Sequence, residues 1–282
     1  MAIHCKTRLA EAAGSNPAES TQVDFMNEEK IVFYNERKQK LVGLLALPKN
    51  KKPPVVVMIH GFAGTKDYPP FFNACVKPLT EAGFAILKID CRGSGESDLE
   101  FKDTTLKSES EDVLTTLDYV KKLNSVNSNK IALIGMSLGC AVILLSLKNN
   151  RDIKTLIFWN PVINIKNDPW LDSQKHRASV KKEGFFSVRQ AVGTKEFTAS
   201  RAFFYEMIHF DASKYFQFVQ VPILFVRGLK DRKERIGTDK NNVRGLKASY
   251  EVIEDADHIF RSQHSQKQLV EITLNWLKKH LK

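Results

Sequence analysis

The sequence predicts an α/β fold in which a mixed, mostly parallel sheet carries helices on both faces. Short apolar runs alternate with helical patterns along the chain; short turns link the early runs and helices link the later ones. With 282 residues, of which 43% are hydrophobic, the chain is long enough to bury one large core. We therefore expect one domain that carries an insertion.

The predicted strands are short apolar runs with β-type composition. In chain order they are Ile31–Tyr34, Leu41–Leu47, Val55–Ile59, Ala85–Ile89, Ile131–Ile134, Thr155–Trp159, Ile223–Arg227 and Ser249–Ile253. The predicted helices have apolar residues at three- and four-residue steps or fill the gaps between strands. They are Phe71–Ala82, Ser110–Leu123, Leu138–Leu147 and Gln266–Leu281.

Two segments depart from this alternation. About sixty residues separate the strand that ends at Trp159 from the strand that begins at Ile223, and connections that long usually have a function. They are rich in aromatic residues, and we expect a helical cap over residues 160–218, inserted into a core of 26–159 and 219–282. Residues 1–25 are small, polar and unpatterned, which predicts a disordered tail or an extension ahead of a start at Met26.

The pattern G-x-S-x-G stands directly after a predicted strand, as Gly135-Met136-Ser137-Leu138-Gly139. In a sharp turn from strand to helix the central serine takes a strained conformation, and the residues two before and two after it must be nearly free of side chain. The serine oxygen then stands clear of the sheet, and the positive end of the following helix points at the reacting centre. Ser137 is therefore the candidate nucleophile.

An activated serine needs a base and a group that orients the base. Two later strands run into polar loops at the sheet edge where α/β proteins place their sites, and these loops contain Asp231 and His258. We predict Asp231 as the acid and His258 as the base. The alternatives are His209 and His264 for the base, and Asp239, Asp255 and Asp257 for the acid.

Negative charge that develops on a substrate oxygen requires two preorganised N–H donors. The amide of Leu138, directly after the nucleophile, is one candidate. The other is the amide of Phe62, in the glycine-containing loop His60–Gly64 that follows the strand Val55–Ile59. We expect His60 to hold this loop through hydrogen bonds rather than to act in catalysis.

Composition and charge exclude several other classes. Cys5, Cys75, Cys91 and Cys140 lack metal-ligand spacing, so no metal is expected. The net charge of +11 comes from lysines in short, dispersed pairs, which argues against a nucleic-acid partner. The turn Asp90–Ser97 lacks the third glycine of a dinucleotide-binding loop, so no cofactor is expected. Because no membrane span or signal peptide is visible, we expect a cytoplasmic protein.

Five motifs in order resemble the α/β-hydrolase superfamily: HGFAG (60–64), DCRGSGES (90–97), GMSLG (135–139), GLKD (228–231) and DADH (255–258). Within it, the HGF loop, the D-x-R-G-x-G-x-S turn and an insertion after the sixth strand are similar to feruloyl/cinnamoyl-esterase-like carboxylesterases and to the serine aminopeptidase-like branch. The resemblance implies an eight-stranded sheet, cofactor-free acyl transfer and a triad of Ser137, Asp231 and His258. Met136 and Cys140 stand where many relatives carry His and Gly.

These observations predict a serine hydrolase, of carboxylesterase type, that acts on small-molecule esters with aryl or short-to-medium acyl groups. Peptidase, amidase and thioesterase activities on the same fold are the alternatives within the enzyme class, because fold membership does not determine the substrate. A hydrolase-like protein that binds a ligand with little turnover is the alternative from another class. The sequence does not determine the oligomeric state.

Overall fold

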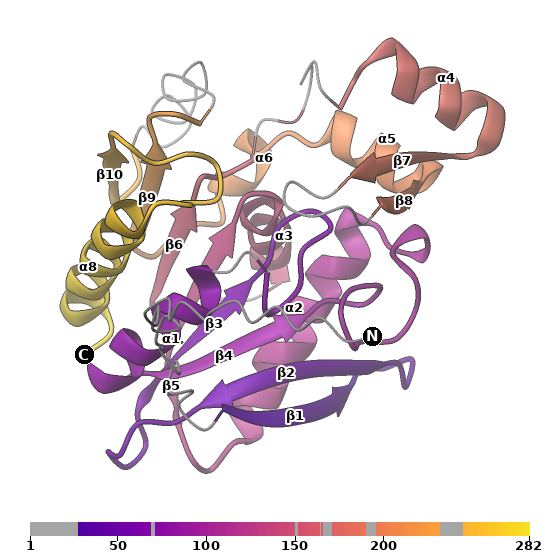
Figure 1. Ribbon diagram of the computed structural model, residues 1–282. Coiled ribbons are helices and arrows are strands. Elements are labelled where there is room, and N and C mark those ends of the chain that lie inside the picture. The colour runs from indigo at the N-terminus through magenta and orange to yellow at the C-terminus, as the bar shows by residue number, and fades with distance from the viewer. Residues whose placement is uncertain are drawn as a thin grey trace, which may run out of the picture.

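The computed structural model of the protein describes residues 28–68, 71–149, 152–163, 165, 171–189, 196–231 and 245–282. Within these ranges a central eight-stranded sheet is covered by helices on both faces (Figure 1). A separate group of elements, inserted into the chain, lies beyond one end of the sheet. The predicted tail, residues 1–25, lies outside the described residues.

The sheet has the strand order β1-β2-β4-β3-β5-β6-β9-β10. In chain order its strands are β1 (Glu28–Tyr34), β2 (Lys40–Ala46), β3 (Pro54–Ile59), β4 (Ala85–Asp90), β5 (Asn127–Met136), β6 (Thr155–Trp159), β9 (Ile223–Gly228) and β10 (Ala248–Ile253). Strand β2 pairs antiparallel with both of its neighbours, whereas β4, β3, β5, β6, β9 and β10 run parallel. The mixed, mostly parallel sheet of eight strands is thus confirmed.

Both faces of the sheet are packed, which explains why the central strands are continuous apolar runs. Every residue of β4 and β6 is buried. Helices α2 (Leu106–Lys122) and α3 (Leu138–Ser146) belong to one apolar cluster, and α1 (Phe71–Glu81) and α8 (Gln263–His280) belong to the cluster on the opposite face. None of the described helices combines the length and the apolar content that crossing a bilayer requires.

Two helices begin earlier than their apolar periodicity predicts. Helix α2 starts at Leu106 because the Thr105 side chain accepts a hydrogen bond from the Ser108 amide. Helix α8 starts at Gln263 because the Ser262 side chain accepts from the Ser265 amide in the same way. Such caps satisfy backbone amides that have no partner within the helix, so each helix begins at its cap and ahead of the apolar repeat.

The chain between β6 and β9 contains strands as well as helices. Its described elements are α4 (Gln174–Glu183), β7 (Phe185–Arg189), β8 (Glu196–Ser200), α5 (Arg201–His209) and α6 (Ser213–Phe216), and β7 pairs antiparallel with β8. The two strands are short and carry polar residues, and the sequence pattern did not predict them. In Figure 1 this insertion projects past the ends of α2 and α3.

Aromatic packing joins the insertion to the core. The buried aromatic residues of the insertion are Phe186, Phe197, Phe203, Phe204, Phe210 and Phe216. Phe203 of α5 packs against Phe62 and Phe101 of the core, with ring centroids 5.5 Å apart in each pair. Of the described aromatic residues in the insertion, Phe185 and Tyr205 are exposed. Most of these side chains therefore form the interior of the insertion and its contact with the core.

Candidate active site

Ser137 lies at the sharp turn between β5 and α3. Its backbone has φ 53° and ψ −118°, in a region that side-chain-bearing residues rarely adopt. The strand β6 holds this conformation, because the Ser137 amide donates to the Trp159 carbonyl over 3.0 Å and the Ser137 carbonyl accepts from the Val162 amide over 3.0 Å. The turn thus aims the serine away from the sheet at its carboxyl edge.

Close backbone contacts explain both glycines of the motif. A Cβ atom on Gly135 would lie 2.9 Å from the Cys140 backbone, and one on Gly139 would lie 2.5 Å from the His60 carbonyl oxygen. Neither position has room for a side chain without movement of the backbone. The pattern G-x-S-x-G is therefore a steric requirement of this turn.

The structure brings Ser137, His258 and Asp231 together. The His258 Nε2 atom lies 3.0 Å from the Ser137 Oγ atom, and its Nδ1 atom lies 3.2 Å from the Asp231 Oδ2 atom. Asp231 follows β9 and His258 follows β10, so three strand ends supply the three side chains. The Asp231 side chain is only 6% exposed, whereas the His258 side chain is 36% exposed and accessible to solvent. This geometry is that of a base held between a hydroxyl group and a carboxylate.

The described alternatives bond elsewhere. Asp257 pairs with Arg261 over 2.5 Å, and Asp255 accepts from the Ser262 hydroxyl over 2.9 Å. The His209 Nδ1 atom lies 2.8 Å from the Tyr205 carbonyl oxygen within α5. His264 lies in the first turn of α8. Asp239 lies outside the described residues.

The loop after β3 packs directly against the serine. A Cβ atom on Gly61 would lie 3.0 Å from the Ser137 Cβ atom, so the backbone that leads into Phe62 passes beside the nucleophile. Leu138 is the first residue of α3, and the first amides of a helix have no carbonyl partner within it. The two amides predicted as oxyanion donors thus belong to segments that flank Ser137.

His60 links the loop His60–Gly64 to the chain that follows β4. The Cys91 amide donates to its Nε2 atom over 3.1 Å, so the ring is protonated on Nδ1, which lies 2.9 Å from the Gly61 carbonyl oxygen and donates to it. Burial lowers the pKa of His60, which favours this neutral ring. The imidazole therefore links the loop to the end of β4, the structural role expected from the sequence.

The turn after β4 is built around a buried carboxylate. Asp90 accepts hydrogen bonds from the Lys66 amide over 2.6 Å, from Lys66 Nζ over 3.0 Å and from the Glu96 amide over 3.0 Å. A Cβ atom on Gly95 would lie 2.0 Å from Asp90 Oδ2, so the turn closes tightly on that group. Hydrogen bonds from Lys30 and Lys66 lower the pKa of Glu96 to about 2. The turn is thereby bonded to Lys66, in the segment that follows the loop His60–Gly64.

Two buried polar residues near the triad, Asn160 and Arg227, are absent from the set predicted from the sequence. The Asn160 side-chain amide donates to the Asp257 and His258 carbonyls over 3.0 and 2.9 Å, and its oxygen accepts from the Gly228 amide over 2.7 Å. Arg227 donates to Asp231 over 2.8 Å. A charged residue inside the apolar run of β9 was the available sequence signal, because a buried charge needs a partner.

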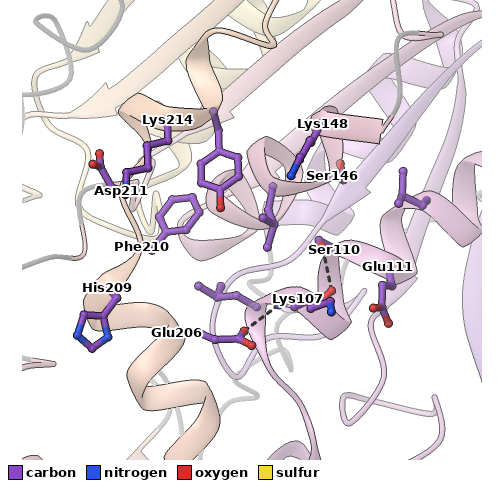
Figure 2. A pocket seen from close by; sticks show the side chains of 14 residues that line it. Lys107, Ser110, Glu111, Ser146, Lys148, Glu206, His209, Phe210, Asp211 and Lys214 are labelled. Carbon is purple, nitrogen blue, oxygen red and sulfur yellow. Dashed lines mark hydrogen bonds between the residues drawn. The ribbon is translucent and has the colours of Figure 1, made fainter.

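A cavity of about 450 Å³ lies elsewhere, between α2, the end of α3, α5 and α6 (Figure 2). Lys107, Lys148, Glu206 and Lys214 line it, and the three residues of the candidate triad do not. Among the residues with assigned positions, no group of three or more His, Cys, Asp or Glu side chains is arranged to hold a metal ion.

Comparisons with known proteins give the family and the fold. A sequence model of the prolyl oligopeptidase family matches residues 70–282. Est1E from Butyrivibrio proteoclasticus, solved with ferulic acid bound, superposes with a TM-score of 0.72 at 21% identity, covering 89% of this chain and 98% of Est1E. The α/β hydrolase GrgF from Penicillium sp. sh18 superposes with a TM-score of 0.74 at 19% identity, covering 90% of this chain and 99% of GrgF.

Curated relatives align over shorter segments. An uncharacterized 31.7 kDa protein of the traX-finO intergenic region from Escherichia coli is 32% identical over 110 residues, which cover 38% of this chain and 37% of that protein. Acylamino-acid-releasing enzyme 1 from Oryza sativa subsp. japonica is 33% identical over 90 residues, which cover 30% of this chain and 12% of that enzyme. The alignment thus spans about a third or less of each relative's length.

Proposed function

Since this chain belongs to the prolyl oligopeptidase family and is a hydrolase of the α/β type, we propose that it is a serine hydrolase that cleaves carboxylic esters through an acyl-enzyme intermediate. One observation carries the proposal: the His258 ring bridges the Ser137 hydroxyl and the Asp231 carboxylate, at 3.0 and 3.2 Å. The chain has Ser137 as nucleophile, His258 as base and Asp231 as the group that orients the base.

The reaction follows from these positions. Ser137 Oγ attacks the ester carbonyl while His258 Nε2 takes its proton, and Asp231 stabilises the imidazolium that forms. The amides of Phe62 and Leu138 donate to the oxyanion of the tetrahedral intermediate. The alcohol leaves with the proton from His258, and a water molecule activated by the same imidazole then releases the acid and regenerates Ser137.

Aryl and short-to-medium acyl esters are the proposed substrates. Phe62, whose amide is a proposed oxyanion donor, packs its ring against the Phe101 ring at 5.1 Å and against Phe203 of α5. The insertion, proposed as a cap over residues 160–218, therefore joins the Phe62 loop through aromatic packing, in which Phe101 and Phe203 are buried and Phe62 is half-buried. Est1E, solved with ferulic acid bound, supports an aryl acyl group as the proposed substrate class.

A peptidase or amidase is the second candidate, because the matching family is that of prolyl oligopeptidase and one aligned relative is an acylamino-acid-releasing enzyme. The same triad then protonates an amine leaving group instead of an alcohol. Thioester cleavage uses the same acyl-enzyme steps.

The experiment is labelling with a fluorophosphonate probe, followed by rate measurements on acetate, butyrate, octanoate and cinnamate esters and on aminoacyl anilides. We expect the wild-type protein to label and Ser137→Ala not to label, and kcat/KM to be highest on the aryl or butyrate to octanoate esters. Turnover of anilides at rates above the esters selects the peptidase. Equal lack of labelling in both proteins selects a non-catalytic binding protein.

A cytoplasmic location is also proposed. The described cysteines Cys75, Cys91 and Cys140 are buried free thiols, and buried free thiols are typical of a reducing compartment. Fractionation of the native host tests this, with activity expected in the cytoplasmic fraction.

A further inference from the structure

Arg227 is a buried cation in a strand of the central sheet. Its side chain is 0% exposed, in contrast to the exposed ends of most arginines. Its Nη1 atom donates to Asp231 Oδ2 over 2.8 Å, and its Nη2 atom donates to the Pro161 carbonyl over 2.6 Å. The planar guanidinium group therefore joins the loop after β9 to the chain that leaves β6 for the insertion.

The contact with Asp231 uses the oxygen that also faces the base. Asp231 Oδ2 lies 2.8 Å from Arg227 Nη1 and 3.2 Å from His258 Nδ1. One carboxylate oxygen thus contacts two nitrogen atoms, one from Arg227 and one from His258. A carboxylate already paired with a cation attracts a second cation less strongly, so Arg227 reduces the attraction between Asp231 and a protonated His258.

We propose that Arg227 is a positioning residue of the proposed triad: it fixes the Asp231 carboxylate by joining it to the Pro161 carbonyl, and it favours the neutral, basic form of the His258 ring. The inference rests on the proposed function, because it assigns Arg227 a role through Asp231 and His258. Arg227 does not contact Ser137 in this arrangement and needs no contact with substrate.

The described loops next to His258 contain other charged residues, which bond to other groups. Asp257, in the same loop, pairs with Arg261 over 2.5 Å. Lys230 belongs to the turn after β9 and bonds through its amide to the Ala256 carbonyl over 2.9 Å. Ser137 faces the Nε2 side of the ring. Within the part of the chain that the structure describes, Asp231 is thus the carboxylate at Nδ1, and Arg227 is a cation that shares its Oδ2 oxygen.

The test compares Arg227→Lys and Arg227→Met with matched changes at Arg261. Arg261 also pairs with an aspartate four positions away, but its side chain is 60% exposed. Arg227→Lys keeps the positive charge but loses the planar guanidinium group with its two donor nitrogens. We therefore expect kcat to fall roughly tenfold with little change in KM. In Arg227→Met, Asp231 lacks this cationic neighbour and attracts the protonated imidazole more strongly than in the wild type. We therefore expect the pH below which kcat/KM falls to move upward by about half a unit or more.

Arg261→Lys and Arg261→Met are expected to keep the wild-type rate and pH profile. A wild-type kcat in Arg227→Lys overturns the inference, and so does an unmoved acid limb in a folded Arg227→Met. Should Arg227→Met not fold, Arg227→Lys alone decides. If the wild-type protein fails to label with the fluorophosphonate probe, the proposed function itself is wrong; if it labels and the Arg227 variants behave like wild type, only this inference is wrong.

Discussion

The loops at the strand ends and the insertion above them are held in place by different forces. Directional bonds to buried groups fix the loops: Asn160 bonds to both loops, and Arg227 bonds to Asp231. Apolar packing holds the insertion, with Phe203 against Phe62 and Phe101. Hydrogen bonds specify positions to a fraction of an ångström, whereas apolar contacts tolerate exchange of side chains. The proposed catalytic site and the insertion therefore have separate structural supports.

The largest effect is expected at the serine and the histidine. Ser137→Ala or His258→Ala should lower kcat on the proposed ester substrates by on the order of 10⁴-fold, because each removes an atom that takes part in proton transfer or bond formation. The double variant should lose little more, since the two residues act as a unit. Steady-state rates with the preferred ester measure this. Losses that multiply in the double variant contradict a shared mechanism.

The second effect separates the two aspartates beside His258. Asp231→Asn should lower kcat by on the order of 10³- to 10⁴-fold, because the amide favours the wrong tautomer of the imidazole. Asp257→Asn is the matched control, since its carboxylate pairs with Arg261 and not with the ring. We expect it to retain kcat within about twofold. Near-normal rates in Asp231→Asn together with loss in Asp257→Asn reverse the assignment of the acid.

The pH profile gives an independent check of the base. The proposed working form of His258 is the neutral imidazole, so kcat/KM should fall towards acid pH as the ring gains a proton. Assays in overlapping buffers at constant ionic strength measure this acid side of the pH–rate profile. A rate independent of pH between 5 and 8 contradicts general base catalysis by this residue.

The core strands and the serine turn were predictable from sequence because they depend on residues that are close together in the chain. Strands such as Val55–Ile59 are buried on both faces and read as uninterrupted apolar runs, and the serine turn shows its steric need as two glycines. The closeness of Asp231 and His258 to Ser137 could be predicted because parallel strands end at one edge, so position along the chain implies position in space.

The missing parts depend on long-range contacts. Asn160 bonds to residues 68 and 98 positions away, and nothing in its own sequence neighbourhood reveals those partners. The β7–β8 pair is short and sits in the insertion, where the aromatic residues that suggested a substrate wall instead form mostly buried contacts. Side-chain periodicity reports burial but not the identity of the packing partner.

The insertion should respond to loss of its aromatic contact. Phe203→Ala removes a fully buried ring at the junction of α5 with Phe62 and Phe101, and should lower the free energy of unfolding by about 3–5 kcal/mol. Tyr205→Ala, on the same helix but exposed, is the control and should cost less than about 1 kcal/mol. Urea unfolding measures both. Equal losses mean that Phe203 does not anchor the insertion.

A buried carboxyl group in α2 links stability to pH. Burial, and the nearby charge of Asp112, raise the pKa of Glu109 to about 8 from an ordinary value of 4.5. The folded protein therefore binds a proton that the unfolded chain has released between these values. Stability should decline as the pH rises from about 5 to 9, by on the order of 3 kcal/mol. Glu109→Gln should flatten this decline in thermal unfolding; an identical decline in the variant assigns it to other groups.

The smallest effect is expected at the polar contact between insertion and core. The Lys107 amide, in the first turn of α2, donates to the Glu206 Oε2 atom of α5 over 3.0 Å (Figure 2). A carboxylate at a helix N-terminus interacts favourably with the helix dipole, so Glu206→Gln should cost about 0.5–1 kcal/mol, and less at high salt. Glu271→Gln, exposed on α8, is the control and should change stability by less than about 0.5 kcal/mol. Because the charge of Glu206 also contributes to the raised pKa of Glu109, after burial and Asp112, the variant should lower that pKa slightly and end the pH-dependent decline at a lower pH. Unchanged stability together with an unshifted decline means that the charge of Glu206 contributes nothing here, and that apolar packing joins the insertion to the core.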